Sequence, residues 1–474
     1  MSLFGRRVIY TKETVVTASN VVDVLNETRD DFIKNRTEAE DLLKYFRGNQ
    51  PILCRKKDIR PEICNKIVEN RANEIVAFKT GYLCGEPIQY ISRSAKSGVA
   101  KNVGKLNDAM LVESKATKDK DLVEWMHIAG HGYRIVLASP DGSESPFELH
   151  TLAPNEAYVI RSRKIGHKVL AGVHCGVDAD GTEVFTVYTD REFFEVKGRE
   201  VTRVQAHALG AVPIVEYPLN NSRLGAFEPV IPILDAINTV TSNRLDGVEQ
   251  FVQSLMKFIN CEVDKDTIKE LMQMGAIQIK STDGQNADVE IMTQELNQQQ
   301  TQTLVDHMYQ TVLTICGMPN RNGNGSSTSD TGAASLLRDG WTLAEARAKD
   351  AELMFKASEQ EMLKVVLRIC GGTSDIFLGL RDIDIKFTRR NYENIQTKAQ
   401  VLCEMLNNDK IDPKLAFTHC GMFTDPEEAY TVSMKWFEEQ QKKLEKEKKI
   451  EAADSREDTA EKLDKNPNKQ TEKS

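Results

Sequence analysis

The stretch that decides the fold reads NKIVENRANEIVAFKTGYLCGEPI and spans residues 65–88. Its apolar residues recur mostly three or four positions apart, which is typical of a helix with one buried face. These residues are Ile67, Ala72, Ile75, Val76 and Phe78. We expect Gly81 to close the helix and the Gly-Glu-Pro turn that follows to lead into a strand. The pattern alone predicts a packed helix–turn–strand unit and no particular function.

Length, charge and cysteine content limit the class of protein. A chain of 474 residues is long enough for about two to four domains or one subunit of several parts. Its 62 basic and 71 acidic residues give a net charge of −9, which argues against a broad basic surface that grips nucleic acid. Nine cysteines without a CxxC pair indicate free thiols in a reducing compartment.

Neither a membrane span nor a secretion signal is predicted. No run of eighteen apolar residues occurs, and no apolar core follows the basic start of the chain. We therefore expect an intracellular product.

The first half of the chain is predicted to be a mixed α+β domain. Residues 21–46 have a helical pattern that ends at the Arg-Gly-Asn-Gln-Pro run of residues 47–51. From residue 89 to about 217 the pattern changes to short strands. Among them, the Asp-Ala-Asp-Gly run of residues 178–181 indicates a hairpin.

The second half has the periodicity of long helices. Residues 234–259 carry an apolar seam with spacings of 3, 4, 3 and 4, which suits helix-on-helix packing. A small insert at 261–295 is predicted to contain a helix at 267–274 and strands at 276–280 and 288–292. A second long helix covers residues 297–316.

A polar loop and a second set of helices follow. Residues 319–332 contain no large apolar side chain after Pro319, and residues 333–370 have a helical pattern in which Gly340 is a candidate kink. A strand at 383–387 is predicted to return to the first half of the chain. The remaining predictions are helices at 394–406, 413–421 and 425–448, and a charged, disordered tail from residue 449.

Eight short segments of the chain are informative together. They are YFRGNQPI (45–52), residues 65–88, GAFEPV (225–230), LDAIN (234–238), GMP (317–319), SDTGAA (329–334), NDKID (408–412) and DPEE (425–428). Taken in order, they resemble segments of the tailed-bacteriophage portal (head–tail connector) proteins of the long-tailed siphophage type. The resemblance covers about residues 30–440, and the order of the segments is its specific part. One departure is Thr331, which stands where the family has the serine of its Ser-Gly-x-Ala helix start.

The resemblance implies an α+β portal fold with a mixed α/β wing, long stem helices, a small α/β clip and a helical crown, assembled as a ring. The implied boundaries are a wing at 1–229, stem helices at 230–259 and 297–317, a clip at 260–296, a tunnel loop at 318–332, a long helix with a return to the wing at 333–389, a crown at 390–448 and a tail at 449–474.

The resemblance also implies a function. The ring, commonly of twelve subunits, would occupy one capsid vertex of the virion and conduct genome DNA during packaging and ejection. Its partners would be the large terminase, the head-completion adaptor, the major capsid and scaffolding proteins, and double-stranded DNA that passes without sequence preference. Assembly would occur in the host cytoplasm, without a membrane, a cofactor, a metal or a catalytic site.

Three groups of residues carry these expectations. The tunnel loop would offer DNA small polar side chains and one cation, at Asn320, Arg321, Asn322, Asn324, Ser326 and Ser327. The clip would meet its partners through Asp264, Lys265, Lys269, Lys280 and Asp283. The stem would pack along Leu245, Val248, Val252, Leu255, Met308 and Val312. Spacing alone favours ordinary core packing within one subunit for these residues. The resemblance favours a contact between the stems of neighbouring subunits.

Two motifs suggest chemistry and are better explained otherwise. His127 and His131 have the i, i+4 spacing of a zinc pair, but Ile128 stands where HExxH has its glutamate, so structural histidines are favoured. The Gly-Asn-Gly run at 323–325 is followed by no Gly-Lys-Ser/Thr and preceded by no buried strand, which argues against a P-loop.

Two other functions fit the sequence less well than a portal. A nuclease or ATPase of the packaging machine would need clustered acids for two metals or a Walker loop, and neither occurs in the sequence. His174 and Cys175 make no nucleophile–base pair, because adjacent strand residues point to opposite faces. A helical oligomeric scaffold protein unrelated to phage would explain the long helices but not the ordered motifs.

Overall fold

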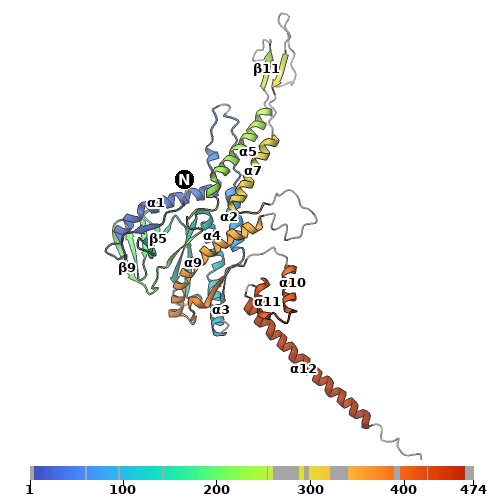
Figure 1. The fold of residues 1–474 in the computed structure, drawn as a ribbon. Coiled ribbons are helices and arrows are strands. Elements are labelled where there is room, and N and C mark those ends of the chain that lie inside the picture. The colour runs from blue at the N-terminus through green and yellow to red at the C-terminus, as the bar shows by residue number, and fades with distance from the viewer. Residues whose placement is uncertain are drawn as a thin grey trace, which may run out of the picture.

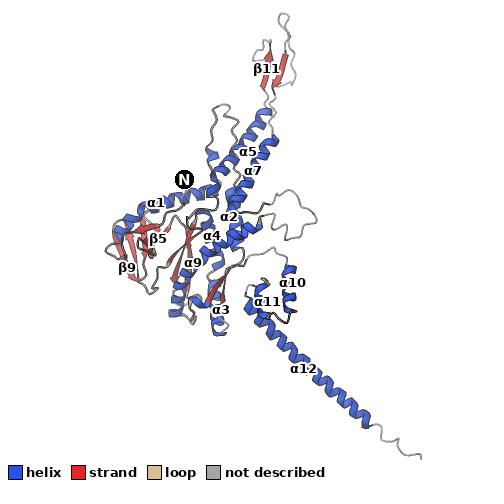
Figure 2. Cartoon of the chain, in the orientation of Figure 1, coloured by secondary structure: helices blue, strands red, loops and turns tan. Residues whose placement is uncertain are grey.

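The computed structural model describes residues 5–58, 61–93, 97–140, 143–252, 255–259, 288–292, 298–320, 340–388, 395–423 and 425–464. The fold is mixed α+β, as the sequence predicts. A body of sheets and helices carries a projecting helix pair at one end and a separate group of helices at the other (Figure 1, Figure 2).

A six-stranded sheet forms one side of the body. Its strand order is β1-β5-β6-β7-β8-β9, antiparallel except for the parallel pair β1–β5. The long helix α1 (Val21–Phe46) packs against it, because Val21, Val24, Leu25 and Phe32 share a buried core with the strands. The strands are β1 (Ile9–Thr11), β5 (Ala157–Ser162), β6 (Val169–Val177), β7 (Glu183–Tyr188), β8 (Glu192–Lys197) and β9 (Glu200–Ala206). The predicted hairpin at 178–181 is confirmed as the β6–β7 turn.

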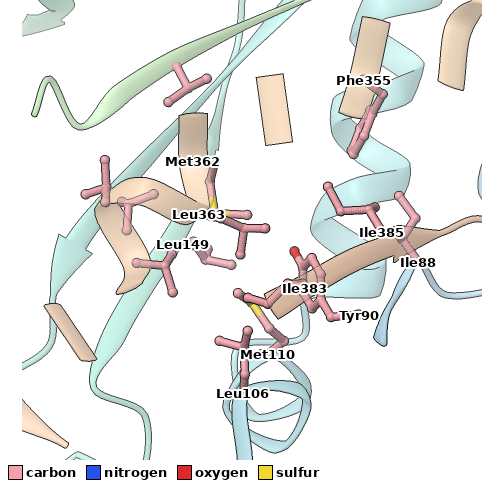
Figure 3. Close-up of a cluster of buried hydrophobic side chains, with 14 of the residues drawn as sticks. Ile88, Tyr90, Leu106, Met110, Leu149, Phe355, Met362, Leu363, Ile383 and Ile385 are labelled. Atoms are coloured by element: carbon pink, nitrogen blue, oxygen red, sulfur yellow. The ribbon is translucent and has the colours of Figure 1, made fainter. Parts of the chain in front are cut away.

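A second core lies around two smaller sheets. One has the order β10-β3-β4, and the other pairs β13 with β2, which confirms that the strand near residue 385 returns to the first half. Figure 3 shows Phe355, Met362 and Leu363 of the long helix α9 in the same cluster as Ile88, Tyr90, Ile383 and Ile385. The elements are β2 (Gln89–Ser92), α3 (Ser97–Val112), α4 (Lys115–Ala129), β3 (His131–Ala138), β4 (Phe147–Leu152), β10 (Ile214–Pro218), α9 (Trp341–Thr373) and β13 (Ile383–Lys386), with short 3-10 turns at Pro51–Cys54, Glu228–Val230 and Leu380–Asp382.

The helix of the opening stretch is shorter at its start and longer at its end than the sequence predicts. Helix α2 spans Arg71–Cys84, so Gly81 lies inside it and does not close it. Asn70 caps its start by accepting a hydrogen bond from the Asn73 N–H at 3.4 Å. Ile67 therefore lies ahead of the helix. Ala72, Ile75 and Val76 are buried as predicted.

The projecting pair consists of α5 (Ile231–Val252) and α7 (Gln298–Cys316), which lie side by side with β11 (Leu255–Ile259) and β12 (Asp288–Met292) beyond their far ends (Figure 1). The prediction of one helix to residue 259 is wrong, because residues 255–259 form a strand that pairs antiparallel with β12. Leu255 is therefore not part of a helical seam. The predicted strand at 288–292 is confirmed.

Helix α9 is preceded by a glycine. Gly340 has φ +81°, a left-handed conformation that non-glycine residues rarely adopt, and it is the N-cap of α9. Residues 333–339 of the predicted helix lie outside the described residues, so the kink at Gly340 stays a prediction.

The last three helices form a small separate group. They are α10 (Ile395–Leu406), α11 (Pro413–His419) and α12 (Pro426–Asp464). The tail predicted to be disordered from residue 449 is helical as far as Asp464, and residues 465–474 lie outside the described residues.

Candidate functional site

A ladder of three short polar side chains on α5 fixes the direction of the projecting helix pair. Asn238, Ser242 and Asp246 are spaced four residues apart and are almost completely buried. They accept hydrogen bonds from the backbone N–H groups of Glu69, Ile67 and Asn65, at 2.8, 2.9 and 2.7 Å.

The three hydrogen bonds can form together because four residues of a helix and two residues of an extended chain cover nearly the same distance. Four helical residues rise about 6 Å, and two residues of extended chain advance about 6.6 Å. Every second N–H of residues 65–69 can therefore meet every fourth side chain of α5. These contacts explain why Ile67 lies outside helix α2, because its backbone donor is satisfied by Ser242 and not by a helical carbonyl.

Cations close the outer end of this ladder. Arg55 lies 3.1 Å from the Asp246 carboxylate, and Lys57 also pairs with it. Burial acts to raise the pKa of Asp246, but hydrogen bonds from Lys57 and Asn65 outweigh it and hold the pKa below its usual value. The ladder thus ends in a charged anchor.

At its base, the helix pair is held by apolar packing. Leu234 and Ile237 of α5 and Val312 and Leu313 of α7 share a buried cluster with α1 and α2. Val312 is fully buried and Met308 packs against the cluster, so these two predicted seam residues pack within their own subunit. Leu245 and Val248 are 38% and 37% exposed. The side chain of Val252 lies outside the described residues.

A buried cluster of charges ties the middle of α9 to the body. Glu359 is completely buried and accepts hydrogen bonds from Tyr90, Tyr217 (2.7 Å) and Lys115 (2.8 Å). Asp119 lies 2.6 Å from Lys115 and 2.7 Å from Arg134. The two acids and two cations balance, so no net charge is buried.

The pKa shifts of the cluster have clear physical causes. Burial acts to raise the pKa of Glu359, but Lys115 and Arg134 outweigh it and hold the pKa below its usual value. The pKa values of Tyr90 and Tyr217 are raised well above 10, through burial and the nearby carboxylate. Both tyrosines therefore stay protonated and donate. Because α9, α4, β3, β2 and β10 all contribute, the cluster pins α9 at one point.

The two ends of the segment between α7 and α9 are also held. At the first end, Gly317 has φ +63° and Met318 donates its N–H to the Leu313 carbonyl at 2.8 Å, which closes α7. A side chain at 317 would meet the Arg347 Cγ atom of α9 at 2.7 Å, so α7 and α9 approach closely here. At the other end, the Trp341 ring lies 6.1 Å from the rings of Phe78 and Tyr82 on α2.

Of the six residues predicted to contact DNA in the tunnel loop, the structure describes one, Asn320. Asn320 lines a hollow of about 670 Å³ between α2, α5 and α7. In this hollow the Arg71 guanidinium stacks on Tyr309 at 4.1 Å. The other tunnel-loop predictions, Arg321, Asn322, Asn324, Ser326 and Ser327, lie outside the described residues. So do the clip predictions Asp264, Lys265, Lys269, Lys280 and Asp283.

The two histidines with zinc-pair spacing are both buried against backbone. The Nδ1 atom of His127 lies 2.8 Å from the Val123 carbonyl, and that of His131 lies 3.3 Å from the Ala129 carbonyl. Burial is the main cause that lowers the pKa of His127 to about 3 and that of His131 to about 4. Both rings are therefore neutral at pH 7, which suits the structural interpretation.

Neither a metal cluster nor a membrane span is found within the described ranges. No three His, Cys, Asp or Glu side chains there are grouped so that they could hold a metal ion. None of the helices in that part of the chain combines the length and apolar character that a membrane crossing requires.

Sequence reasoning missed both the α5 ladder and the Glu359 cluster. A signal for the ladder exists, since Asn238, Ser242 and Asp246 form a polar stripe at helical spacing between apolar positions. Glu359 has no such signal, because it lies in a helix rich in Glu and Lys and only the fold buries it.

Comparison with known proteins identifies the class. A family model matches residues 25–453, and the family is one of phage structural proteins, the portal proteins. The chain belongs to it; its description is "Phage portal protein, SPP1 Gp6-like". No curated protein matches the chain.

Solved structures of gene transfer agent (GTA) particles are also similar. A chain from "Virion of native gene transfer agent (GTA) particle" is 11% identical with a TM-score of 0.46, and the match covers 82% of this chain and 94% of that one. A chain from "Neck of native GTA particle computed with C12 symmetry" is 13% identical with a TM-score of 0.44, over 74% and 90%.

Proposed function

We propose that this portal protein assembles into a ring, of about twelve copies, that forms the DNA channel at one capsid vertex. The observation that carries the proposal is the family match over residues 25–453. Genome DNA would pass through the ring during packaging, driven by a separate ATPase, the large terminase, and again during ejection. The head-completion adaptor would replace terminase, while capsid and scaffolding proteins would surround the ring during assembly in the host cytoplasm.

The parts of the subunit have corresponding roles in this proposal. Residues 1–229 with β13 are the wing, α5 and α7 the stem, 260–296 the clip, 318–332 the tunnel loop and 390–448 the crown. The α5 ladder and the apolar base of the stem hold the helix pair at a fixed angle to the wing. This rigidity favours a ring, because each subunit must present the same geometry to its neighbour.

The channel wall must not bind the DNA that it conducts. Each phosphate paired with a Lys or Arg releases counterions and adds affinity, so a basic wall would retain DNA. A net charge of −9 per subunit suits a passage of low affinity. We assign the tunnel loop a transient, sequence-independent contact through Asn320, Arg321, Asn322, Asn324, Ser326 and Ser327. Packaging at normal rates by R321A rings would remove the role of the arginine.

Two of the predicted stem residues are exposed and could contact a neighbouring subunit. Leu245 and Val248 are both more than one-third exposed on α5, whereas Val312 is buried against residues of its own subunit. We propose that these two residues contact the stem of an adjacent copy. The clip side chains Asp264, Lys265, Lys269, Lys280 and Asp283 would meet terminase and then the adaptor.

Negative-stain electron microscopy of the purified chain tests the ring. Rings with a central hole and about twelve-fold symmetry are expected. Monomers or dimers at micromolar concentration across several salt conditions would contradict the ring and favour a helical scaffold protein without a channel. A variant with Leu245 and Val248 changed to Ser should lower the ring fraction, and one with the exposed Leu353 of α9 changed to Ser serves as its control.

A further inference from the structure

The turn between strands β5 and β6 is rich in cations. Residues 161–168 read RSRKIGHK, with four cations and no acid, although the whole chain carries a net charge of −9. Arg161 is held within the subunit, 2.9 Å from the Glu216 carboxylate. The other three cations are exposed in the turn, which we call the β5–β6 tip (residues 163–168); they are Arg163, Lys164 and Lys168.

Two of these three cations make no ion pair in the part of the chain that the structure describes. Arg163 lies 3.6 Å from the Glu27 carboxylate, and its side chain is 59% exposed. Among the described residues no acid lies within ion-pair distance of Lys164 or Lys168. Their charges are therefore available to an anion from outside the subunit.

The apex of the tip is apolar. Ile165 is fully exposed, more than any other large apolar side chain described. A side chain at the next residue, Gly166, would meet no atom within 4 Å, so the apex stands in open solvent. A single exposed apolar residue needs no explanation by itself. Here it stands between unpaired cations on a backbone that is held in a fixed shape.

The backbone of the tip is strained and firmly held. His167 has φ +43°, which non-glycine residues rarely adopt. Its N–H donates to the Lys164 carbonyl at 2.9 Å, its Nδ1 atom lies 3.2 Å from the Ser162 carbonyl oxygen, and its ring centre is 5.0 Å from that of Tyr10. The Ser162 N–H also donates to the Lys168 carbonyl at 2.9 Å. Strain of this kind persists only where the surroundings hold it, and it gathers at ligand-binding sites.

We propose that the β5–β6 tip enters the major groove of double-stranded DNA, where its cations contact phosphates and Ile165 contacts base edges. The major groove is about 12 Å wide and admits a two-stranded β-ribbon. The strands of such a ribbon are about 4.8 Å apart, which leaves room for side chains on both sides. An apolar apex can contact thymine methyl groups there.

Double-stranded DNA fits the tip better than an acidic protein surface does. Arg163 and Lys164 precede the apex and Lys168 follows it, so positive charge lies on both sides of Ile165. Every DNA groove has phosphates along both of its edges. A protein would need acids on two sides of an apolar socket, which is a far more special arrangement.

The tip lies apart from the elements assigned to the channel. In Figure 1 the strands β5 and β9 lie at one side of the body, and the projecting pair α5 and α7 rises from another part of it. A contact at the tip therefore does not retard DNA that moves along the channel. It is a second DNA contact, distinct from the one proposed for the tunnel loop, and it does not require the ring.

Fluorescence anisotropy with the purified chain and a labelled duplex of about 30 base pairs, in about 50 mM salt, tests the proposal. K164A/K168A should bind the duplex at least about tenfold more weakly than wild type, and its plot of log affinity against log salt should be shallower by about 1.8. I165S should bind at least about fourfold more weakly, the effect of one buried methyl group, with an unchanged salt slope.

Two controls isolate the tip. K34A/K101A removes the same charge from two exposed lysines on α1 and α3, and it should bind like wild type. Poly-L-glutamate, matched to unlabelled duplex in charge concentration, should displace the labelled duplex at least about tenfold less effectively than the unlabelled duplex does, because it has no groove.

Each other result contradicts the proposal. Wild-type chain that does not bind the duplex would overturn it, and so would a loss in K34A/K101A as large as that in K164A/K168A. Wild-type affinity in I165S would overturn the placement in the groove. Equal displacement by poly-L-glutamate would overturn it in favour of an acidic protein partner. Electron microscopy of the same samples tests the ring separately, since rings whose tip does not bind DNA overturn only this proposal.

Discussion

The body around α9 and the group α10–α12 are both largely helical, yet they are stabilised in opposite ways. The second half of α9 is enclosed by a large apolar cluster, and its Glu359 is paired within the subunit. Among the described side chains of the α10–α12 group, three apolar ones are buried and nine large ones are more than one-third exposed. Because the free energy of folding follows apolar burial, packing within the subunit stabilises the body far more than it stabilises the helical group. Substitutions of the same chemical kind should therefore have very different effects in the two regions.

The largest effect is expected for Glu359→Ala. It leaves Lys115 and Arg134 with one carboxylate instead of two inside the body, and breaking a buried ion pair from one side costs about 3–5 kcal/mol. Equilibrium denaturation in urea, monitored by circular dichroism, measures the loss. Glu361→Ala is the matched control on the same helix, because its pair with Lys364 is exposed and worth about 0.5 kcal/mol or less. Equal losses in both variants would show that the buried cluster does not hold α9.

The second effect is a loss of stability in mild acid that originates in the body. His131 is neutral when folded, with a pKa of about 4 lowered mainly by burial, and has a pKa near 6.5 when unfolded. Below pH 6.5 the unfolded state therefore binds a proton that the folded state does not. The unfolding free energy should fall by about 1.4 kcal/mol per pH unit for each such histidine, and His127, with a pKa of about 3, behaves in the same way.

Unfolding at several pH values between 6.5 and 5 isolates this effect. Carboxylates with lowered pKa, such as Glu216 at about 2, contribute mainly below pH 4.5. A His131→Gln variant should have a shallower slope by about 1.4 kcal/mol per pH unit. His150→Gln, which replaces a half-exposed histidine on β4, is the control for the substitution itself. An unchanged slope in His131→Gln would mean that the ring does not stay neutral when folded.

A smaller effect is expected at the α5 ladder. Ser242→Ala removes the acceptor of the Ile67 N–H, and an unsatisfied buried donor costs about 1–3 kcal/mol. Thr239→Ala on the same helix removes only an exposed hydroxyl that bonds to the Asp235 carbonyl of its own helix, and should cost little. Urea denaturation of both variants gives the comparison. A loss in Thr239→Ala equal to that in Ser242→Ala would indicate a general effect on helix propensity instead of the ladder.

Local patterns in the sequence predicted what local forces decide. Helix α1 has its predicted bounds, 21–46, because a regular apolar face and a clear stop at Gly48 and Pro51 define it. The predictions were wrong for residues whose conformation depends on contacts with residues far away in the sequence. Ile67 lies outside helix α2 because Ser242, 175 positions away, accepts its N–H. Leu255 continues the helical spacing of the α5 stripe, but antiparallel pairing with Met292 makes it part of a strand.

The same distinction between local and distant contacts applies to the candidate site. Val312 and Met308 were predicted to lie on a packing face, and they do, although their partners are in the same subunit. The pairing of Glu359 with Lys115 could not be predicted, because no spacing links residues 244 positions apart and only the assembled core makes them neighbours. The roles predicted for the tunnel-loop residues, Asn320 included, and for the clip residues stay predictions.

The smallest effect is expected for the crown variant W436S/F437S in the unassembled chain. Both rings are already at least half exposed, so their removal should change the unfolding free energy of a single subunit by about 0.5 kcal/mol or less. Urea denaturation of the double variant and of the wild type, monitored by circular dichroism, measures the difference. A loss as large as that of Glu359→Ala would mean that the two side chains are packed within the subunit, and the contrast with the Glu359 cluster would then disappear.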